Sequence, residues 1–184
     1  MGAITPLIFS LGSTQQLDEL LDPSRIVKFD LDGTGRNQLW PWVKADTAIL
    51  VWDPSGSGRV ESGRQLFGTV TWWMFWCDGY AAPDALDDDR DGWLSGQELA
   101  GLAVWFDCNS NGICDPGEVM PIESLGIESI SVRWTSRDGR SPCNRLGIRL
   151  SDGRVPSVRC AVGGWSADRG CERTRSRWPG LADC

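Results

Sequence analysis

Two twelve-residue segments near the middle of the chain place oxygen-bearing side chains at intervals suited to a hard cation. The first runs from Asp87 to Glu98, and the second runs from Asp107 to Glu118. Both have Asp at position 1, Asp or Asn at positions 3 and 5, Gly at position 6 and Glu at position 12. Calcium takes roughly six to eight oxygen ligands, and this spacing delivers them from one short stretch of chain. The sequence therefore predicts two Ca2+ sites, each built from a single loop.

This spacing is the EF-hand loop pattern, in which each position has its own role. Positions 1, 3 and 5 offer side-chain oxygens, position 7 a backbone carbonyl, position 9 a side chain or water, and position 12 a bidentate carboxylate. Glycine at position 6 permits the sharp turn. The predicted ligands of the first loop are Asp87, Asp89, Asp91, Trp93 (through its carbonyl), Ser95 and Glu98. Those of the second loop are Asp107, Asn109, Asn111, Ile113 (through its carbonyl), Asp115 and Glu118.

The charge of the two loops predicts their relative affinity. The first loop supplies four ligand carboxylates and the second supplies three, so we expect the first to bind calcium more tightly. The affinities should fall between roughly micromolar and millimolar values, as in sensors and extracellular modules. Because the carboxylates repel one another without metal, we also expect calcium to stabilise the fold.

The overall composition suits a cation binder and excludes several other chemistries. The chain has 184 residues, a formal charge of −7, eleven Trp and no His. Without His it has no His-ligated zinc site, Ser-His-Asp triad or Cys-His dyad, and we expect no enzyme activity. The acidic body, residues 1–132, argues against a nucleic-acid partner. No run of roughly 18 apolar residues is present, so we expect no membrane span.

Hydrophobic periodicity predicts an α+β fold, in which short helices and paired EF-hand-like calcium loops pack on a small antiparallel sheet. Helices are expected at 15–21, at 79–86 before the first loop, and at 99–106 between the loops. Leu94 and Cys114, both at position 8, are expected to face each other in a two-stranded bridge. The expected strands are 6–11, 26–31, 48–52, 127–134 and 146–150.

The chain divides by composition into a body and a tail. Residues 1–155 are expected to form the calcium-binding module, with the loop pair at 79–120. Residues 156–184 are rich in Arg, Gly, Ser and Cys with almost no periodicity. An irregular or disordered tail, a disulfide-bearing appendix and out-of-frame translation all fit this composition.

Two earlier turns share part of the loop pattern but lack Glu at position 12. Weak calcium sites and plain hydrogen-bonded turns remain equally open for both. The turn that starts at Asp30 continues with Asp32, Thr34 and Gly35 at positions 3, 5 and 6, and Pro41 at position 12. The turn that starts at Asp53 continues with Ser55, Ser57, Gly58 and Glu61 at positions 3, 5, 6 and 9, and Arg64 at position 12.

The segment from Val27 to Thr34 resembles the first motif of the haloacid dehalogenase-like phosphatases. That resemblance would make Asp30 the nucleophile and Asp32 the general acid/base. The match covers eight residues, however, and Gly35 departs from the apolar residue that the family has next. The alternation of strands and helices that builds a parallel sheet is also missing, so a phosphatase is the least favoured alternative.

The order of segments over roughly residues 5–135 resembles the calcium-binding modules of large bacterial exported proteins of the repeats-in-toxin kind. The corresponding pieces are Phe29–Gly35, Ile49–Gly68, Asp78–Glu98 and Asp107–Glu118, followed by Leu125–Ile130. The resemblance implies an extracellular, periplasmic or cell-surface setting and folding coupled to calcium. It also implies that the partner is another protein or the rest of a larger exported protein.

Two further alternatives come from related calcium proteins. Some proteins of the resembled kind cleave themselves at an Asp-Pro bond just before the module's first strand, but the matching position here is Thr5-Pro6. Dockerins also use paired calcium loops, in their case to order helices for a protein partner. They are much shorter and lack the strands that precede the loops here.

Overall fold

The computed structural model describes residues 4–12 and 16–161. These residues form twelve β-strands in three antiparallel sheets, together with two α-helices of four residues each. The expected α+β fold built on paired helix-loop-helix units is therefore wrong, because the described chain is mostly β. A short apolar run has the same appearance in a helix and in a fully buried strand, which explains the error.

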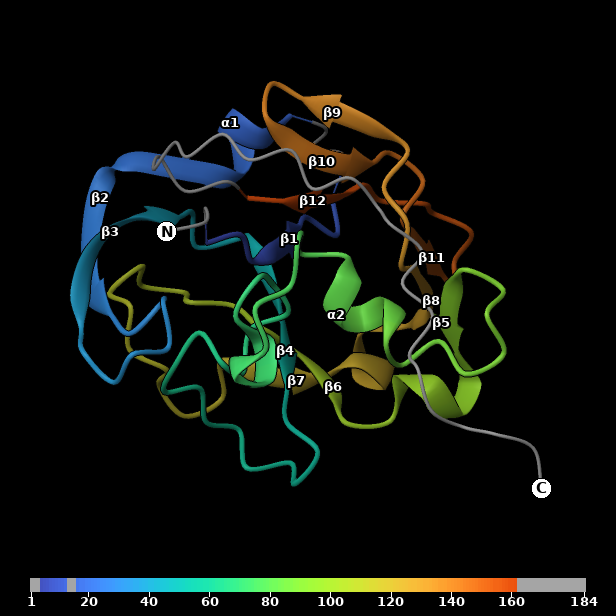
Figure 1. Ribbon diagram of the computed structural model, residues 1–184, viewed down its shortest axis with the longest axis horizontal. Helices are drawn as coiled ribbons and strands as arrows, with labels where there is room; N and C mark the ends of the chain where they lie inside the picture. The colour runs from blue at the N-terminus through green and yellow to red at the C-terminus, as the bar shows by residue number, and fades with distance from the viewer. Residues whose placement is uncertain (1–3, 13–15, 162–184) are drawn as a thin grey trace.

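A seven-stranded sheet forms the centre of the molecule, with the order β7-β6-β4-β1-β12-β10-β9 (Figure 1). Its strands are β1 (Leu7–Phe9), β4 (Ala48–Trp52), β6 (Leu102–Trp105), β7 (Val119–Pro121), β9 (Ser136–Asp138), β10 (Ser141–Asn144) and β12 (Val158–Cys160). Side chains of β4 alternate between two separate cores: Leu50 lies in one, and Ile49 and Val51 lie in the other. The middle of this sheet is therefore covered on both faces, which explains the continuous apolar sequence of β4.

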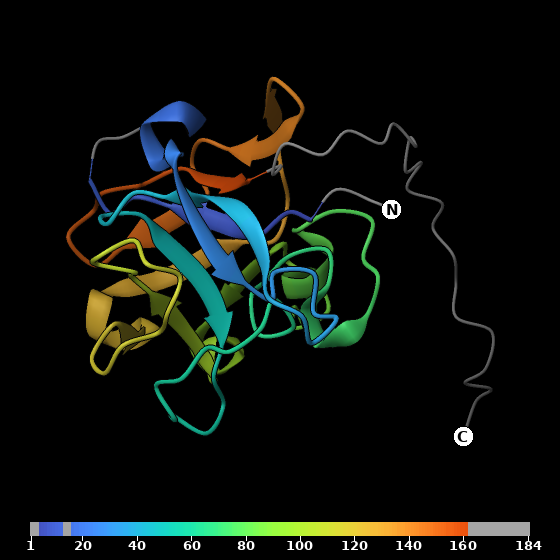
Figure 2. The same cartoon turned by 90° about the vertical axis from the view of Figure 1, so that its left-hand side faces the viewer.

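A long hairpin covers one face of the central sheet. It consists of β2 (Leu21–Phe29) and β3 (Gln38–Val43), and Figure 2 shows it on the side nearest the viewer. Phe29 and Trp42 of the hairpin pack against Trp105 of β6, with ring centroids 5.4 to 5.8 Å apart. This aromatic cluster joins the hairpin to the sheet.

A three-stranded sheet covers the other face, with the order β11-β8-β5. Its strands are β5 (Trp93–Ser95), β8 (Ile127–Ser131) and β11 (Ile148–Leu150). Leu94, Ile130 and Ile148 are fully buried and belong to the same core as Leu50 of β4. Each of the two cores therefore lies between the central sheet and one covering layer.

The helices are α1 (Leu17–Leu20) and α2 (Ala81–Asp84), and three short 3-10 turns occupy Thr71–Trp73, Gly96–Leu99 and Ile122–Leu125. The helix expected at 99–106 is wrong, since half of that segment is strand β6 and no α-helix occurs in it. Leu102 and Val104 point into one core while Ala103 and Trp105 point into the other, so tertiary burial decides the conformation. No helix among the described residues has the length and apolarity that a membrane crossing requires.

The pairing expected between Leu94 and Cys114 is also wrong. Leu94 pairs with Ile130 of β8, and Cys114 instead donates its thiol to the carbonyl of Gly58 at 3.5 Å. The two loops therefore sit on different sheets. The strand predicted at 48–52 is confirmed by β4, and the strands predicted at 127–134 and 146–150 are confirmed over the shorter ranges of β8 and β11, which pair with each other although β9 and β10 lie between them in the chain.

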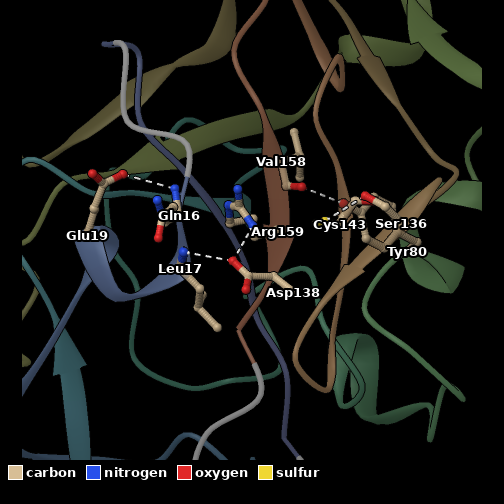
Figure 3. A network of polar contacts seen from close by, with 9 residues as sticks. All are labelled: Gln16, Leu17, Glu19, Tyr80, Ser136, Asp138, Cys143, Val158 and Arg159. Carbon is tan, nitrogen blue, oxygen red and sulfur yellow. Dashed lines mark hydrogen bonds and ion pairs between the residues drawn. The ribbon is translucent and has the colours of Figure 1, made fainter.

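Strand β12 lies beyond residue 155, in the segment expected to be tail, and it pairs with β1 and β10. Residues 162–184 lie outside the described residues. Arg159 of β12 is buried and forms an ion pair of 2.7 Å with Asp138 of β9, whose Oδ2 also accepts the backbone N–H of Leu17 (Figure 3). This network ties the N-terminal helix, β9 and β12 together.

Thiol labelling should distinguish two cysteines of the described fold. Burial raises the pKa of Cys160 to about 12, whereas Cys108 is exposed at position 2 of the second loop. Since the thiolate is the reactive form, iodoacetamide at neutral pH should label Cys108 and leave Cys160 unlabelled in folded protein. Peptide mass spectrometry checks this, and both should react in denaturant. Equal labelling rates in folded protein would contradict the packing of β12.

Candidate metal centre

The first loop follows α2, forms β5 with its positions 7 to 9, and turns its position-1 carboxylate inward. Asp87 is 8% exposed, and its Oδ2 accepts the backbone N–H of Gly92 at 2.9 Å. Its other oxygen, Oδ1, is buried without a hydrogen-bond partner among the described residues. A buried unpaired carboxylate oxygen is costly unless a ligand satisfies it.

Two other acidic side chains of the first loop lie close to Asp87. Carboxylate oxygens of Asp87, Asp89 and Asp91 lie within 4.8 Å of one another. Glu98 turns back across the loop, and its two oxygens accept the backbone N–H groups of Asp88 at 2.8 Å and Ser95 at 3.0 Å. The structure therefore brings the side chains at positions 1, 3 and 5 together and fixes the carboxylate of position 12 by backbone hydrogen bonds.

The second loop connects β6 to β7, so a hairpin carries it rather than a helix pair. Asp107 is fully buried, and its Oδ2 accepts the N–H of Gly112 at 2.7 Å, as Asp87 does in the first loop. Its Oδ1 accepts the N–H of Asn111 at 3.0 Å. The indole N–H of Trp42 donates to Oδ2 at 2.5 Å, which connects the loop to the β2–β3 hairpin.

Glu118 of the second loop repeats the arrangement of Glu98 in the first. Glu118 accepts the N–H groups of Cys108 at 2.9 Å and Asp115 at 3.0 Å, which again are positions 2 and 9. The indole N–H of Trp105 donates to Glu118 at 3.2 Å. The amide of Asn109 donates to Asp115 at 2.9 Å, so these two side chains also lie together.

All four turns of the chain that carry the loop pattern have the same backbone geometry. In each, the N–H of the position-6 glycine donates to the position-1 carboxylate at 2.7 to 2.9 Å. In each, positions 4 and 6 both have positive φ. The position-4 residues are Gly33, Gly56, Arg90 and Ser110, and the position-6 residues are Gly35, Gly58, Gly92 and Gly112. Non-glycine residues in this conformation carry strain on the order of 1 kcal/mol, which the two complete loops accept at Arg90 and Ser110.

The two incomplete turns already satisfy their carboxylates with protein donors. Asp53 accepts bonds from Ser57 and Gly58, and Asp30 accepts bonds from Gly35, Arg36 and Ser62. Burial pushes the pKa of Asp53 upward, but these hydrogen bonds outweigh it and hold the pKa below its usual value. Protein donors therefore hold the position-1 carboxylates of these two turns, as they also hold Asp107 of the second loop.

The hydrogen bonds of Asp30 also bear on the resemblance of the segment from Val27 to Thr34 to a phosphatase motif. Asp30 is only 6% exposed and both of its oxygens are occupied, so it offers no free nucleophilic oxygen. The ammonium of Lys44, which would have to neutralise a phosphoryl group, donates instead to the carbonyl of Asp18 at 3.3 Å. The residues of this segment therefore serve a turn.

Three of the four turns converge on one cleft of about 480 Å³. Its lining comes from the ends of β2 and of the Asp30 turn, from the Asp53 turn, and from the second loop. The lining residues are Lys28, Phe29, Asn37, Arg59, Val60, Glu61, Gly112, Ile113, Cys114 and Pro116. Burial in this cleft raises the pKa of the Cys114 thiol, which keeps it protonated and unsuited to redox chemistry.

The donor sets of both complete loops consist of oxygen atoms, which suits a hard divalent cation and not a thiophilic metal. In the first loop, the structure brings together the Asp87, Asp89 and Asp91 carboxylates that the spacing indicated. Sequence reasoning missed the indole donors Trp42 and Trp105, and it missed Arg133, whose guanidinium lies against the first loop. Trp42 and Asp107 are 65 positions apart, so no local spacing could have indicated their contact.

Comparison with known proteins places the chain in a family. A stretch of 111 residues, 58% of this chain, is 35% identical to the iron-regulated protein FrpA of Neisseria meningitidis serogroup C. That stretch covers 10% of the length of FrpA, so the chain corresponds to a small part of this relative. The family model of the SPM domain matches residues 18–150, which include both loops, both incomplete turns and most strands of the described fold. The chain belongs to the SPM domain family.

Proposed function

We propose that this protein is a calcium-binding module in which the two complete loops each hold one Ca2+. The observation that carries the proposal is the buried Oδ1 of Asp87, which has no partner among the described residues and lies among the Asp89 and Asp91 carboxylates. A divalent cation would satisfy this oxygen and remove the repulsion between the three charges. Calcium is preferred over magnesium because twelve-residue loops with a position-12 Glu supply more oxygens than an octahedral ion takes.

Calcium in this proposal acts on the fold rather than on a substrate. The second loop is bonded through Asp107 and Glu118 to Trp42 and Trp105, which belong to the aromatic cluster between the hairpin and the central sheet. The first loop includes β5, which is the edge of the three-stranded sheet. An ion in either loop would therefore stabilise the attachment of one covering layer, and it would stabilise the native state by mass action.

The setting and partner follow from the same reasoning. Loops in the roughly micromolar to millimolar affinity range are filled where calcium is abundant, so we propose an extracytoplasmic location. Because FrpA is about ten times longer than the matched segment, we propose that the module serves a larger exported protein as a calcium-stabilised structural or interaction unit. No catalytic role is proposed.

A calcium titration of chelator-stripped full-length protein tests the proposal. Calorimetry should show two sites, the tighter one at the first loop, and the fluorescence of Trp42 and Trp105 should respond to the second. Glu98→Gln should remove the first site alone, and Glu118→Gln should remove the second alone. Because the loops lie on different sheets, we expect the remaining site to keep its wild-type affinity. Absence of any calcium-dependent heat or spectral change would refute the proposed function.

A further inference from the structure

An arginine side chain from outside the first loop lies directly against its turn. Arg133 follows β8, and its Nη2 donates to the carbonyl of Arg90 at 3.4 Å. A Cβ atom built on Gly92 would lie 2.9 Å from both Cζ and Nε of Arg133. A side chain at position 6 would therefore displace the guanidinium, and the φ of 94° independently favours glycine there.

The two residues that Arg133 touches are the ones that shape the ligand turn. Gly92 donates its N–H to Oδ2 of Asp87, and Arg90 holds the strained position 4 with φ of 60°. Arg133 is nevertheless in no ion pair within 4.0 Å in the described part of the chain, where such pairs join Arg154 to Asp152 and Arg159 to Asp138. Its guanidinium therefore contacts the backbone of the loop and not one of the carboxylates.

A second cation supports the same electrostatic environment. Cζ of Arg149 lies 3.8 Å from the ring centroid of Trp93, which occupies position 7 of the loop. Arg149 comes from β11 and reaches Trp93 of β5 across the outer face of the three-stranded sheet. The loop with four ligand carboxylates is thus bordered by two guanidinium groups contributed from a later part of the chain.

We propose that Arg133 is a built-in counter-cation of the first loop and lowers its affinity for calcium. This inference rests on the proposed calcium binding at that loop. Without metal, the guanidinium offsets the mutual repulsion of Asp87, Asp89, Asp91 and Glu98. When a divalent ion enters, the same guanidinium repels it. The attraction to the carboxylates is present in both states, so the repulsion of the ion alone lowers the affinity, and Arg133 is a positioning and affinity-setting residue rather than a ligand.

The two effects give Arg133→Gln a pair of changes with opposite sign. Calcium affinity at the first loop should rise, while the stability of the calcium-free protein should fall. A residue that merely held the loop in shape would, on removal, lower both. The size of the affinity change should also scale with the charge of the ion, because the repulsion is Coulombic.

The experiment compares Arg133→Gln, Arg133→Lys and the wild type in full-length protein, each also in a Glu118→Gln background that leaves the first loop as the remaining site. We expect Arg133→Gln to lower the calcium Kd of the first loop about threefold to tenfold. Arg133→Lys should stay near the wild-type value. Arg140→Gln, which removes the same charge from the β9–β10 turn, is the matched control and should leave the Kd unchanged.

Terbium and salt supply the readouts that separate electrostatics from shape. Tb3+ binding is followed by tryptophan-sensitised luminescence. The ratio of wild-type Kd to Arg133→Gln Kd for Tb3+ should be about the three-halves power of the same ratio for Ca2+, because the ion charges are three and two. For Ca2+, the ratio of wild-type Kd to Arg133→Gln Kd should fall toward one as the ionic strength rises. An unchanged or weaker calcium affinity in Arg133→Gln would overturn the inference. Equal ratios of wild-type Kd to variant Kd for Ca2+ and Tb3+ would also overturn it. Absence of calcium binding at the first loop of the wild type would instead refute the proposed function itself.

Discussion

Replacing Asp87 with Asn is expected to abolish calcium binding at the first loop without destabilising the calcium-free fold. The side-chain oxygen of Asn can still accept the Gly92 N–H, while its NH2 group takes the place of the unpaired Oδ1 and can donate to the Asp89 or Asp91 carboxylate. The change therefore removes a metal ligand and a buried charge together. We expect more than a ~100-fold loss of affinity, since even residues that only support ligands are worth about 10- to 100-fold.

The equivalent substitution in the second loop should behave differently, and it serves as the matched comparison. Both oxygens of Asp107 accept N–H donors, from Asn111, Gly112 and Trp42. An amide side chain at this position would present its NH2 group to one of these donors, so we expect Asp107→Asn to cost about 2 to 3 kcal/mol even in chelator.

Urea unfolding in chelator and calorimetry with calcium measure both effects. Equal stability losses in chelator for the two variants would show that Asp87 is held by the protein as firmly as Asp107. That result would contradict the role of its unpaired oxygen.

Asp138→Ala is expected to lower the free energy of unfolding by about 2 kcal/mol, with the same loss in calcium and in chelator. The substitution leaves the guanidinium of Arg159, which is 2% exposed, without its counter-charge and removes the acceptor for the Leu17 N–H. Breaking a fully buried pair costs about 3 to 5 kcal/mol, and the 40% exposure of Asp138 reduces that figure here. Urea unfolding followed by tryptophan fluorescence measures the change.

Two further variants separate the buried charge from general damage at this corner of the fold (Figure 3). Adding Arg159→Met to Asp138→Ala removes the orphaned charge and should recover most of the loss. Asp152→Ala breaks the exposed pair with Arg154 and should cost much less stability than Asp138→Ala. If the double variant were less stable than Asp138→Ala, the guanidinium would be contributing through its packing and not its charge.

The loop residues could be predicted from the sequence because their chemistry is local. Twelve consecutive residues supply the ligands, the glycine and the turn, so the spacing from Asp87 to Glu98 contains nearly all of the geometry. The conformation of the flanking segments is not local. Leu102–Trp105 is strand β6 because β4 and β7 lie beside it, and only the folded chain reveals that both of its faces are buried.

The difference between local and non-local determinants also explains why strand β12 was assigned to the tail from the sequence. Val158–Cys160 has three residues and no recognisable period, and it is ordered by pairing with β1, about 150 positions earlier in the chain. The donors to the second loop depend likewise on the β2–β3 hairpin folding over the sheet. Contacts of this kind arise from topology, which the spacing of residues does not encode.

The pairing of β1 with β12 has a mechanical consequence. Leu7 lies opposite Cys160, and Phe9 lies opposite Val158, so the first and last strands of the described fold meet at the same end of their ladder. A tensile load applied between the start of β1 and the end of β12 would pull on this end of the ladder. It would break the hydrogen bonds between the two strands one pair at a time instead of loading all of them together. Neither of the two loops proposed to bind calcium contributes a residue to β1 or β12. Calcium would therefore raise the thermodynamic stability of the module far more than its resistance to the first step of being pulled open.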